Sequence, residues 1–371
     1  RAPARGRSVR GRTAHSHAAR AGIRDRVAPT IPLRGASALL VCRAKEPPVS
    51  VSSNRRVAVI GGFGFIGLAL TQHLRRLGAH VTVVTRSLDA HRDAIAGCEA
   101  HGVGVVEGDL RDSAAMAAVV SAHDVLFNLA GQSGAVRSME DPWTDLDVNL
   151  RGNLVLLEAM RASNRAPKIV FVGSRLEYGR VGDAPVNEEH PLDPLCLHAV
   201  HKLTAEKYLR LYEQLFGLRF AVARVTNPYG PGQPRTRTAY GVVNRMIHLA
   251  VTDDTVPVYG DGRQRRDYIY IDDVAAALAR LGESAVSDGR TYNVGTGVGT
   301  RLVDMARRVT ELAGSGRVEL VDWPPLAEQV ETGDFVADIS RIRRELGWQP
   351  AVSLDEGLQR TLAFYRAHVA S

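Results

Sequence analysis

A glycine-rich turn between a short apolar run and a helical pattern constrains the fold of this chain most. The β-branched run Val57–Ile60 is followed at once by Gly61, Gly64 and Gly67. Glycine allows a tight turn and a close approach of the backbone to a ligand, and a helix that starts there presents unpaired amides to an anion. A glycine triplet alone is a weak signal, but strand, turn and helix in this order predict a dinucleotide pyrophosphate site.

Short apolar runs alternate with helical patterns from Arg55 onward, which predicts a Rossmann-type α/β fold with a doubly wound parallel sheet. The predicted strands are Val57–Ile60, Val81–Thr85, Val103–Glu107, Val125–Leu129 and Lys168–Val172, and the predicted helices include Ile66–Leu77, Leu154–Met160 and Tyr208–Leu215. After Val225 the segments become turn-rich and end in an amphipathic helix near Leu354–Tyr365. We therefore expect a dinucleotide-binding domain over 55–225 and a smaller C-terminal α/β substrate lobe over 226–371, with returns to the Rossmann sheet.

Positive charge is concentrated in the first 54 residues. The chain has 47 basic and 40 acidic residues, and residues 1–54 hold eleven of the basic and two of the acidic ones, which leaves 36 and 38 for the rest. The folded part therefore has no excess of positive charge for nucleic acid. Residues 1–54 lack apolar periodicity and are predicted to be a disordered basic extension; a transit peptide, which has a similar composition, is the alternative.

Cysteine content and hydropathy point to the cytoplasm. Cys42, Cys98 and Cys196 are too few for a disulfide framework, which indicates a reducing compartment. The longest apolar run, around Ala36–Cys42, is far shorter than the roughly 18 residues of a membrane span. We expect a cytoplasmic protein that binds neither a membrane nor nucleic acid.

The end of the second predicted strand bears on the choice of cofactor. A carboxylate that would bind the ribose 2′-hydroxyl of NAD usually stands there, but this chain has Thr85 followed by Arg86. Arg86 would attract a 2′-phosphate, so NADP is favoured over NAD; the alternative is that Arg86 is only a solvated loop residue. Asp109, after the third strand, is a candidate for the adenine edge.

Several further short motifs lie between residues 55 and 371. They are Gly108-Asp-Leu, Asn128-Leu-Ala-Gly-Gln132, Asp147-Val-Asn149-Leu-Arg-Gly152, Phe171-Val-Gly-Ser174-Arg-Leu-Glu-Tyr178-Gly179, Lys202-Leu-Thr-Ala-Glu-Lys-Tyr208, Arg224-Val-Thr-Asn227-Pro-Tyr-Gly-Pro-Gly232, Arg266-Asp-Tyr-Ile-Tyr-Ile-Asp-Asp273, Asn293-Val-Gly295 and Ala337–Pro350. Together with the glycine turn, they resemble the extended short-chain dehydrogenase/reductases, specifically the nucleotide-sugar epimerase/dehydratase group. The resemblance is specific for the family but not for one reaction within it.

The resemblance implies transient hydride transfer between a sugar carbon and a nicotinamide, with the sugar bound as a nucleotide diphosphate. Ser174 matches the serine that hydrogen-bonds the reacting oxygen, and Lys202 matches the lysine that contacts the nicotinamide ribose. The cofactor contacts implied, beside Arg86 and Asp109, are Gly61, Gly64, Phe65, Ile66, Gly67, Leu110, Leu129, Ala130, Asn149 and Lys202. The family also implies a homodimer, formed through the helices that contain Asn149 and Lys202.

The chain departs from the family at the catalytic tyrosine. The tyrosine would stand four residues before Lys202, on the same helical face, and His198 occupies that position. His198 can itself carry the proton, because histidine titrates near 6.5, and the Lys202 charge would push it toward its neutral form. On this interpretation the activity profile has a limb near neutral pH. Two alternatives are that another group such as Tyr178, or a water, takes the role, or that the site only binds its ligand.

A second departure concerns the diphosphate clamp. Asn227 and Arg266 match residues that contact the substrate diphosphate in the family, and the guanidinium fork of arginine suits that task. Glu331 stands where many relatives have arginine, so one cation of the clamp is missing and other anionic substrates come into question. Cys196, His198 and His201 lack a second paired motif, so we expect no metal site.

Three functions remain open. The chain is predicted to be an NAD(P)-dependent epimerase or dehydratase of a nucleotide sugar, with Ser174, His198 and Lys202 handling the proton. The alternatives are an NADPH-dependent ketoreductase of the same family, which would consume its cofactor stoichiometrically, and a non-catalytic ligand-binding protein on this fold.

Overall fold

A computed structural model of the chain describes residues 55–91, 95, 98, 100–182, 185–233 and 241–369. These residues belong to one compact unit that spans Pro47–Ser371. The predicted disordered extension over 1–54 lies outside the described residues.

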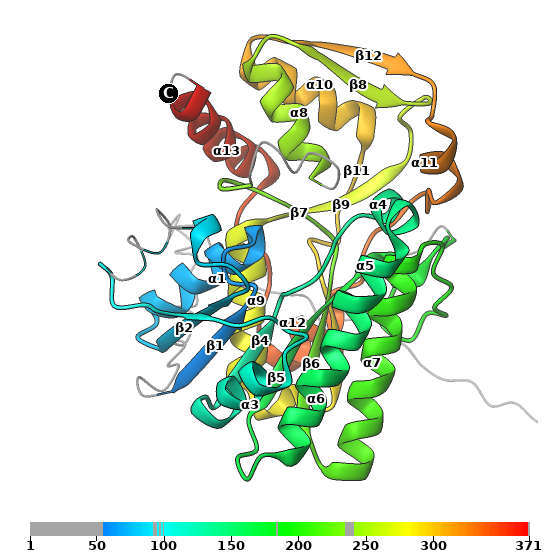
Figure 1. Cartoon of the computed structure of the whole chain (residues 1–371). Helices are drawn as coiled ribbons and strands as arrows, with labels where there is room; N and C mark the ends of the chain where they lie inside the picture. Colours follow the sequence, from blue (N-terminus) through cyan, green and yellow to red (C-terminus); the bar gives the residue numbers. More distant parts are fainter. Residues whose placement is uncertain are drawn as a thin grey trace, which may run out of the picture. The chain divides into compact units, whose positions relative to one another are not determined.

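Seven strands form a central sheet in the order β10-β6-β5-β4-β1-β2-β3, and every pair is parallel (Figure 1). The strands are β1 (Arg56–Ile60), β2 (His80–Thr85), β3 (Gly104–Glu107), β4 (Val125–Asn128), β5 (Lys168–Ser174), β6 (Arg219–Val225) and β10 (Arg290–Val294). The strand order reverses between β1 and β4, and in such sheets ligands bind at this switch point, outside the carboxyl ends of the strands. The predicted doubly wound parallel sheet is confirmed.

Helices cover both faces of this sheet. α1 (Phe65–Arg76), α9 (Ile271–Glu283) and α12 (Ser340–Leu346) pack on one face, and α3 (Ser113–Ala122), α6 (Gly152–Ala162) and α7 (Leu197–Phe216) pack on the other (Figure 1). Within β1, Val57 and Val59 belong to the first core and Ala58 and Ile60 to the second. Burial on both faces explains why the strands read as continuous apolar runs rather than as alternating ones.

A smaller group of elements packs around its own core beyond the carboxyl ends of the strands (Figure 1). It contains β7 (Asn227–Tyr229), α8 (Val242–Val251), β8 (Thr255–Tyr259), β9 (Arg265–Tyr270), β11 (Gly299–Arg301), α10 (Leu302–Ala313), β12 (Arg317–Val321), α11 (Pro325–Gln329) and α13 (Leu354–Val369). In between, the chain returns to the large sheet as α9, β10 and α12. The predicted boundary at residue 225 stays a prediction.

Several short turns lie between the long elements. They are η1 (Asp89–His91), α4 (Ala135–Glu140), α5 (Pro142–Leu146), the π-helical turn η2 (Asp147–Arg151), the 3₁₀ turn η3 (Arg175–Tyr178) and η4 (Ala285–Ser287). η2 and η3 carry Asn149 and the residues after Ser174. None of the described helices combines the length and apolarity that crossing a membrane requires.

Candidate functional site

The glycines after β1 leave no room for side chains at two of the three predicted positions. Gly61 has a φ of 80°, and a Cβ built there would lie 2.8 Å from the Ala130 nitrogen. A Cβ on Gly67 would lie 2.6 Å from the Gly61 oxygen. Gly64 differs, because a Cβ there would meet only the Gly61 oxygen, at 3.1 Å. Gly61 and Gly67 therefore shape the turn, while Gly64 borders open space in which a ligand could approach the backbone.

The first turn of α1 is available to an anion. The helix begins at Phe65 after Gly64, and no described side chain caps it. Its first amides, which include those of Phe65 and Ile66, lack intrahelical partners and point along the positive end of the helix dipole. The arrangement suits a pyrophosphate group.

Two basic side chains surround the predicted adenine contact. Arg111, which the sequence interpretation did not include, donates to both carboxylate oxygens of Asp109 at 2.9 and 2.7 Å. These bonds lower the pKa of Asp109 to about 2, and the charge of the exposed Arg86 adds to the effect. Thr85 at the end of β2 is buried. Asp109 therefore stays ionised between two cations.

The remaining predicted cofactor residues line the ends of neighbouring strands. The Leu129 amide donates to the Ile60 carbonyl at 3.0 Å, and the Ala130 backbone packs against Gly61. Leu110 is buried and its side chain approaches Gly152 at the start of α6. The structure thus brings the glycine turn and the segments after β3 and β4 to one edge of the sheet.

Ser174, at the end of β5, caps the turn η3. Its hydroxyl accepts the Leu176 amide at 3.2 Å, and Glu177 accepts the Ser174 amide at 2.6 Å, which completes a capping box. Neither bond uses the hydroxyl proton of Ser174, so this proton can be donated to a ligand oxygen.

Lys202 is buried on α7 and lies between the ends of β4 and β5. Its Nζ donates to the Val172 carbonyl at 2.9 Å and sits 4.7 Å from the centre of the Phe171 ring. It also lies 3.7 Å from a Cβ built on Gly131, in the loop after β4. Burial lowers the pKa of Lys202 to about 8, and Glu177 opposes this shift.

His198 lies one turn before Lys202 and is buried. Burial, and then the charge of Lys202, lower the pKa of His198 to about 4, while Asp145 acts in the opposite direction. The structure therefore predicts that the limb lies near 4 rather than near neutral pH, because the isolated-residue value ignores desolvation. The effect of Lys202 on His198 has the predicted sign.

Asn149 joins the cofactor side to His198. Its Nδ2 donates to the Gln132 carbonyl at 2.7 Å and lies 3.4 Å from Nδ1 of His198. Its Oδ1 is buried without a partner among the described residues and faces Gly131. A buried amide oxygen with unused capacity in a π-helical turn is typical of a ligand-binding position.

Tyr178 is excluded as the missing acid or base. It is fully buried, its hydroxyl donates to Asn293 at 2.7 Å, and it accepts from Arg224 at 3.0 Å. Burial raises its pKa to about 12. Tyr178 is therefore a packed aromatic residue.

The two predicted diphosphate ligands lie in one cluster with a carboxylate. Asn227 donates to the Asp267 carbonyl at 2.9 Å, and Arg266 is buried. Glu331, where the family resemblance leads one to expect an arginine, forms an ion pair with Arg266 and also accepts the Gly333 amide at 2.8 Å. The acid thus occupies part of the guanidinium fork that an anionic ligand would use.

Arg175 is a buried cation of this cluster that the sequence interpretation missed. Its Nε donates to Asn227 Oδ1 at 3.1 Å and its Nη1 to Thr332 at 2.9 Å. Burial, and then the nearby Arg266, lower the pKa of Arg175 to about 9. The buried Tyr268 hydroxyl, close to both arginines, has no partner among the described residues. The position of Arg175 directly after Ser174 was the available signal.

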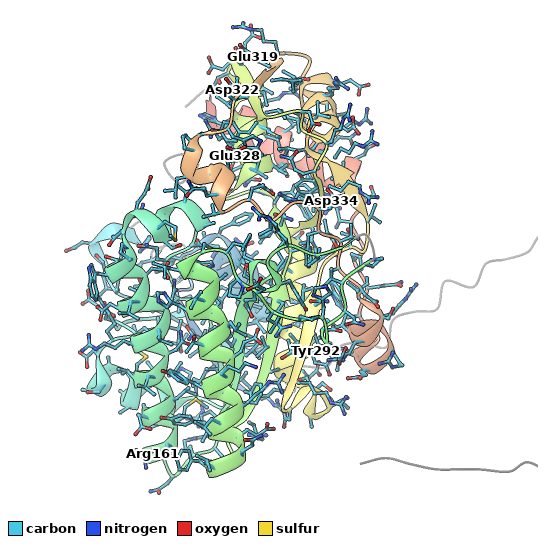
Figure 2. The ribbon with its side chains drawn as sticks, turned by 90° about the vertical axis from the view of Figure 1, so that its right-hand side faces the viewer. Arg161, Tyr292, Glu319, Asp322, Glu328 and Asp334 are labelled. Atoms are coloured by element: carbon cyan, nitrogen blue, oxygen red, sulfur yellow. The ribbon has the colours of Figure 1, made fainter. Side chains whose placement is uncertain are left out.

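A cleft of about 470 Å³ opens beside Glu331. Figure 2 shows two of its acidic residues, Glu328 and Asp334, on the smaller group of elements. The full lining is Arg180, Asp261, Arg263, Gln264, Trp323, Glu328, Glu331, Gly333 and Asp334. Among the described residues, no group of His, Cys, Asp and Glu side chains is arranged to hold a metal ion.

Comparison with known proteins agrees with this geometry. The sequence profile of the NAD dependent epimerase/dehydratase family matches residues 57–295. The chain belongs to this family. It is 32% identical over 317 residues to a UDP-glucose 4-epimerase of Mycolicibacterium smegmatis, with 84% of this chain and 98% of the relative covered. It is 30% identical to a dTDP-glucose 4,6-dehydratase of Streptomyces griseus, with 84% and 94% covered.

A solved structure extends the likeness to the fold. The UDP-glucose 4-epimerase of Thermus thermophilus in complex with NAD superimposes on this chain with a TM-score of 0.76 at 31% sequence identity. The match covers 84% of this chain and 99% of the epimerase chain. The predicted family membership is confirmed, and this chain is an enzyme of an NAD-dependent epimerase/dehydratase family.

Proposed function

We propose that this enzyme interconverts or dehydrates a nucleoside-diphosphate sugar by transient hydride transfer, with Ser174, His198 and Lys202 around the reacting hydroxyl. The observation that carries the proposal is the meeting of buried His198 and Lys202 with Asn149 beside the glycine turn. A bound nicotinamide dinucleotide supplies the hydride acceptor. It would be held by Gly61, Gly64, Phe65, Ile66, Gly67, Leu110, Leu129, Ala130, Asn149 and Lys202, together with Arg86 and Asp109.

In this proposal each side chain has one task. The Ser174 hydroxyl donates a hydrogen bond to the sugar oxygen, and neutral His198 accepts that oxygen's proton and returns it later in the cycle. Lys202 holds the ribose of the cofactor, and its positive charge favours neutral His198. The low pKa of His198 keeps it in the base form across the physiological range.

For the substrate we propose a nucleotide sugar whose diphosphate binds Arg266, Asn227 and Arg175. The relatives named above act on UDP-glucose or dTDP-glucose, which share this group. Arg175 supplies the second guanidinium that the change to Glu331 removes from the family's clamp. An incoming diphosphate would replace Glu331 at Arg266.

For the cofactor we propose a preference for NADP within this NAD-dependent family. The support is the absence of a carboxylate at the end of β2, where Thr85 stands, and the exposed Arg86 that follows it. Two cations, Arg86 and Arg111, flank Asp109 in this part of the site. Their charge favours a ligand with an additional phosphate.

We also propose a homodimer through α6 and α7. These helices and α5 expose apolar side chains that a second copy would cover, since water-exposed patches of this kind mark interfaces. They are Trp143, Leu154, Val200, Leu211, Leu215 and Phe216. We expect Leu211→Glu with Leu215→Glu to give a monomer in light scattering; an unchanged mass would refute this interface.

Cofactor stoichiometry tests the proposed reaction. The purified enzyme is incubated with a panel of UDP- and dTDP-sugars and catalytic amounts of NAD or NADP, and products are identified by NMR. An epimerase or dehydratase forms product without net consumption of cofactor, whereas consumption of NADPH in step with product supports the ketoreductase. No turnover in the parent, with a gain in His198→Tyr, supports the binding protein.

A further inference from the structure

A carboxylate lies behind His198, in the interior of the protein. Asp145 of α5 is fully buried, and its Oδ1 accepts a hydrogen bond from Nδ1 of His201 at 2.7 Å. Its other oxygen, Oδ2, has no hydrogen-bond partner among the described residues and lies 3.9 Å from Nδ1 of His198. One carboxylate therefore faces two imidazoles, and it is bonded to only one of them.

The helices explain this meeting. His198 and His201 are three residues apart on α7, so they share one side of the helix, and α5 packs against that side. Asp145 is held in the first turns of α5, where Asp141 caps the helix and Pro142 begins it. The three side chains are thus fixed by two packed helices rather than by a loop.

An unpaired oxygen on a buried carboxylate is costly, so the arrangement calls for an explanation. Several other ionisable groups face His198, Asp145 or Lys202, and Lys202 is the one whose charge opposes protonation of His198 most. Among the described residues these groups are His201, Lys202, Cys196, Glu177 and Glu206. Apart from the Gln132 carbonyl, Asp145 is the group that favours the protonated ring.

We propose that Asp145 and His201 are positioning residues that orient His198 and select its tautomer. This inference rests on the proposed function, in which His198 is the acid and base. At 3.9 Å the Asp145 Oδ2 is beyond hydrogen-bond distance, but its negative charge favours a proton on Nδ1 of His198, which leaves the lone pair on Nε2. The Asn149 Nδ2, 3.4 Å from the same Nδ1, is a donor and opposes this tautomer, so the proposal requires the carboxylate to outweigh the amide. His201 holds the carboxylate through Oδ1, which keeps Oδ2 directed at His198.

The proton balance follows from this tautomer. In this tautomer the sugar hydroxyl would lose its proton to Nε2 of His198, and a bound nicotinamide would supply the acceptor for the hydride from the carbon that carries this hydroxyl. The imidazolium then carries a proton on each nitrogen, and Oδ2 of Asp145 is its counter-ion. When the hydride returns, Nε2 gives the proton back to the oxygen, and no step transfers a proton to Asp145.

The tautomer of His198 can be measured without turnover. Long-range ¹H–¹⁵N spectra of histidine-labelled protein, assigned with His198→Gln, distinguish a proton on Nδ1 from one on Nε2. We expect Nδ1–H in the parent and a shift toward Nε2–H in Asp145→Asn, whose amide can donate to the ring. An unchanged His198 tautomer in Asp145→Asn would overturn the inference, whether or not the enzyme turns over any sugar nucleotide.

Kinetics supply the second readout. We expect Asp145→Asn to lower kcat at least 100-fold with KM changed less than about threefold, as for a carboxylate behind a catalytic histidine. In the His198→Tyr background, the same substitution should change kcat less than about threefold, because tyrosine has no tautomer to select. An equal loss in both backgrounds would show a structural role and contradict the proposal.

Two further variants keep the test interpretable. Glu140→Gln removes an exposed carboxylate near α5 and should leave tautomer and kcat unchanged. His201→Gln keeps the Asp145 carboxylate and covers the case in which Asp145→Asn does not fold; it should lower kcat about tenfold and mix the two tautomers. An unaltered His198 signal in His201→Gln would remove His201 from the proposal. Failure of the proposed function would instead appear as an inactive parent with the expected spectra.

Discussion

The glycine turn of the proposed cofactor site is built from backbone, whereas the proposed reacting position is built from side chains. At the glycine turn, Gly61 and Gly67 are required because any Cβ would meet backbone atoms within 3 Å. Around the reacting position, by contrast, the contacts are made by His198, Asn149 and Lys202. A substitution at Gly61 or Gly67 would disturb the turn itself, whereas a side chain at the reacting position can be exchanged without a backbone clash.

Two departures from the family pattern concern side chains on the proposed substrate side. By the family resemblance, His198 stands where a tyrosine is expected, and Glu331 stands where many relatives have an arginine. Each departure is accompanied by a buried partner: Asp145 lies behind His198, and Arg175 lies beside the pair of Glu331 with Arg266. The comparison teaches that the role of an unexpected side chain depends on the buried groups it contacts. For His198 this group is Asp145, and for Glu331 it is Arg266.

Replacing His198 should give the largest effect. In His198→Ala we expect kcat to fall by about 10³-fold, within the range for loss of a general acid and base, while the Kd for the dinucleotide changes little. Steady-state kinetics and cofactor titration measure the two quantities. Weaker dinucleotide binding with an unchanged kcat would contradict this prediction and would assign His198 to the cofactor side of the site.

The pH profile sharpens the same prediction. The base form of His198 is neutral, so activity is present above its pKa and is lost as pH falls through about 4. Stability of the protein must be followed alongside by circular dichroism, because acid also unfolds proteins. A limb near 6.5 in a folded protein would mean that His198 is not the titrating group or is not buried during turnover.

The glycines of the cofactor half should separate stability from binding. Gly67→Ala forces a Cβ against the Gly61 and Gly62 backbone, so we expect about 2 kcal/mol of destabilisation, typical of overpacking. Gly64→Ala has more room, and should cost less stability but weaken the dinucleotide about tenfold. Chemical denaturation and cofactor titration of both variants test this. If both variants lost the same amount of stability and of dinucleotide affinity, Gly64 and Gly67 would not have the different roles proposed here.

Features made by residues that are neighbours in the chain could be predicted from the sequence. The strands Val57–Ile60 and Val81–Thr85 were predicted to within one residue of β1 and β2, because a sheet buried on both faces leaves continuous β-branched runs. The glycine turn was predictable for a similar reason, since its residues are neighbours in the chain.

Pairs distant in sequence were not predictable. Asp145 bonds His201, which lies 56 residues further along the chain, and Glu331 pairs with Arg266 at a separation of 65. Neither pairing leaves a periodic or local signal in one sequence. The pKa of His198 was missed for the same reason, because desolvation depends on the packing of α5 against α7. The departures from the family motif drew attention to His198 and Glu331 but gave no indication of the residues they contact.

The clamp should respond to two substitutions in opposite directions. Arg175→Met removes a buried guanidinium, and we expect KM for the nucleotide sugar to rise about tenfold, the value of one charge-assisted bond. Glu331→Gln removes the acid that competes for Arg266, and should lower KM about threefold. Measurement with the free nucleoside diphosphate as a competitive inhibitor separates diphosphate binding from sugar binding. Changes of the same sign would mean that Glu331 belongs to the binding site and does not compete with the diphosphate.

Arg86 should give the smallest effect, because an exposed ion pair contributes at most about 1 kcal/mol. We expect Arg86→Ala to weaken NADP binding about fivefold and to change the Kd for NAD less than twofold. The substitution would then alter mainly the preference between the two cofactors. The difference should shrink as salt is raised from 20 to 500 mM, since screening acts on the charge of the 2′-phosphate. Thr85→Ala at the neighbouring buried position is the matched control and should affect both cofactors alike. Equal weakening of NAD and NADP binding by Arg86→Ala would contradict a contact with the 2′-phosphate. Arg86 would then act, through Asp109, on the pyrophosphate or adenine that both cofactors share.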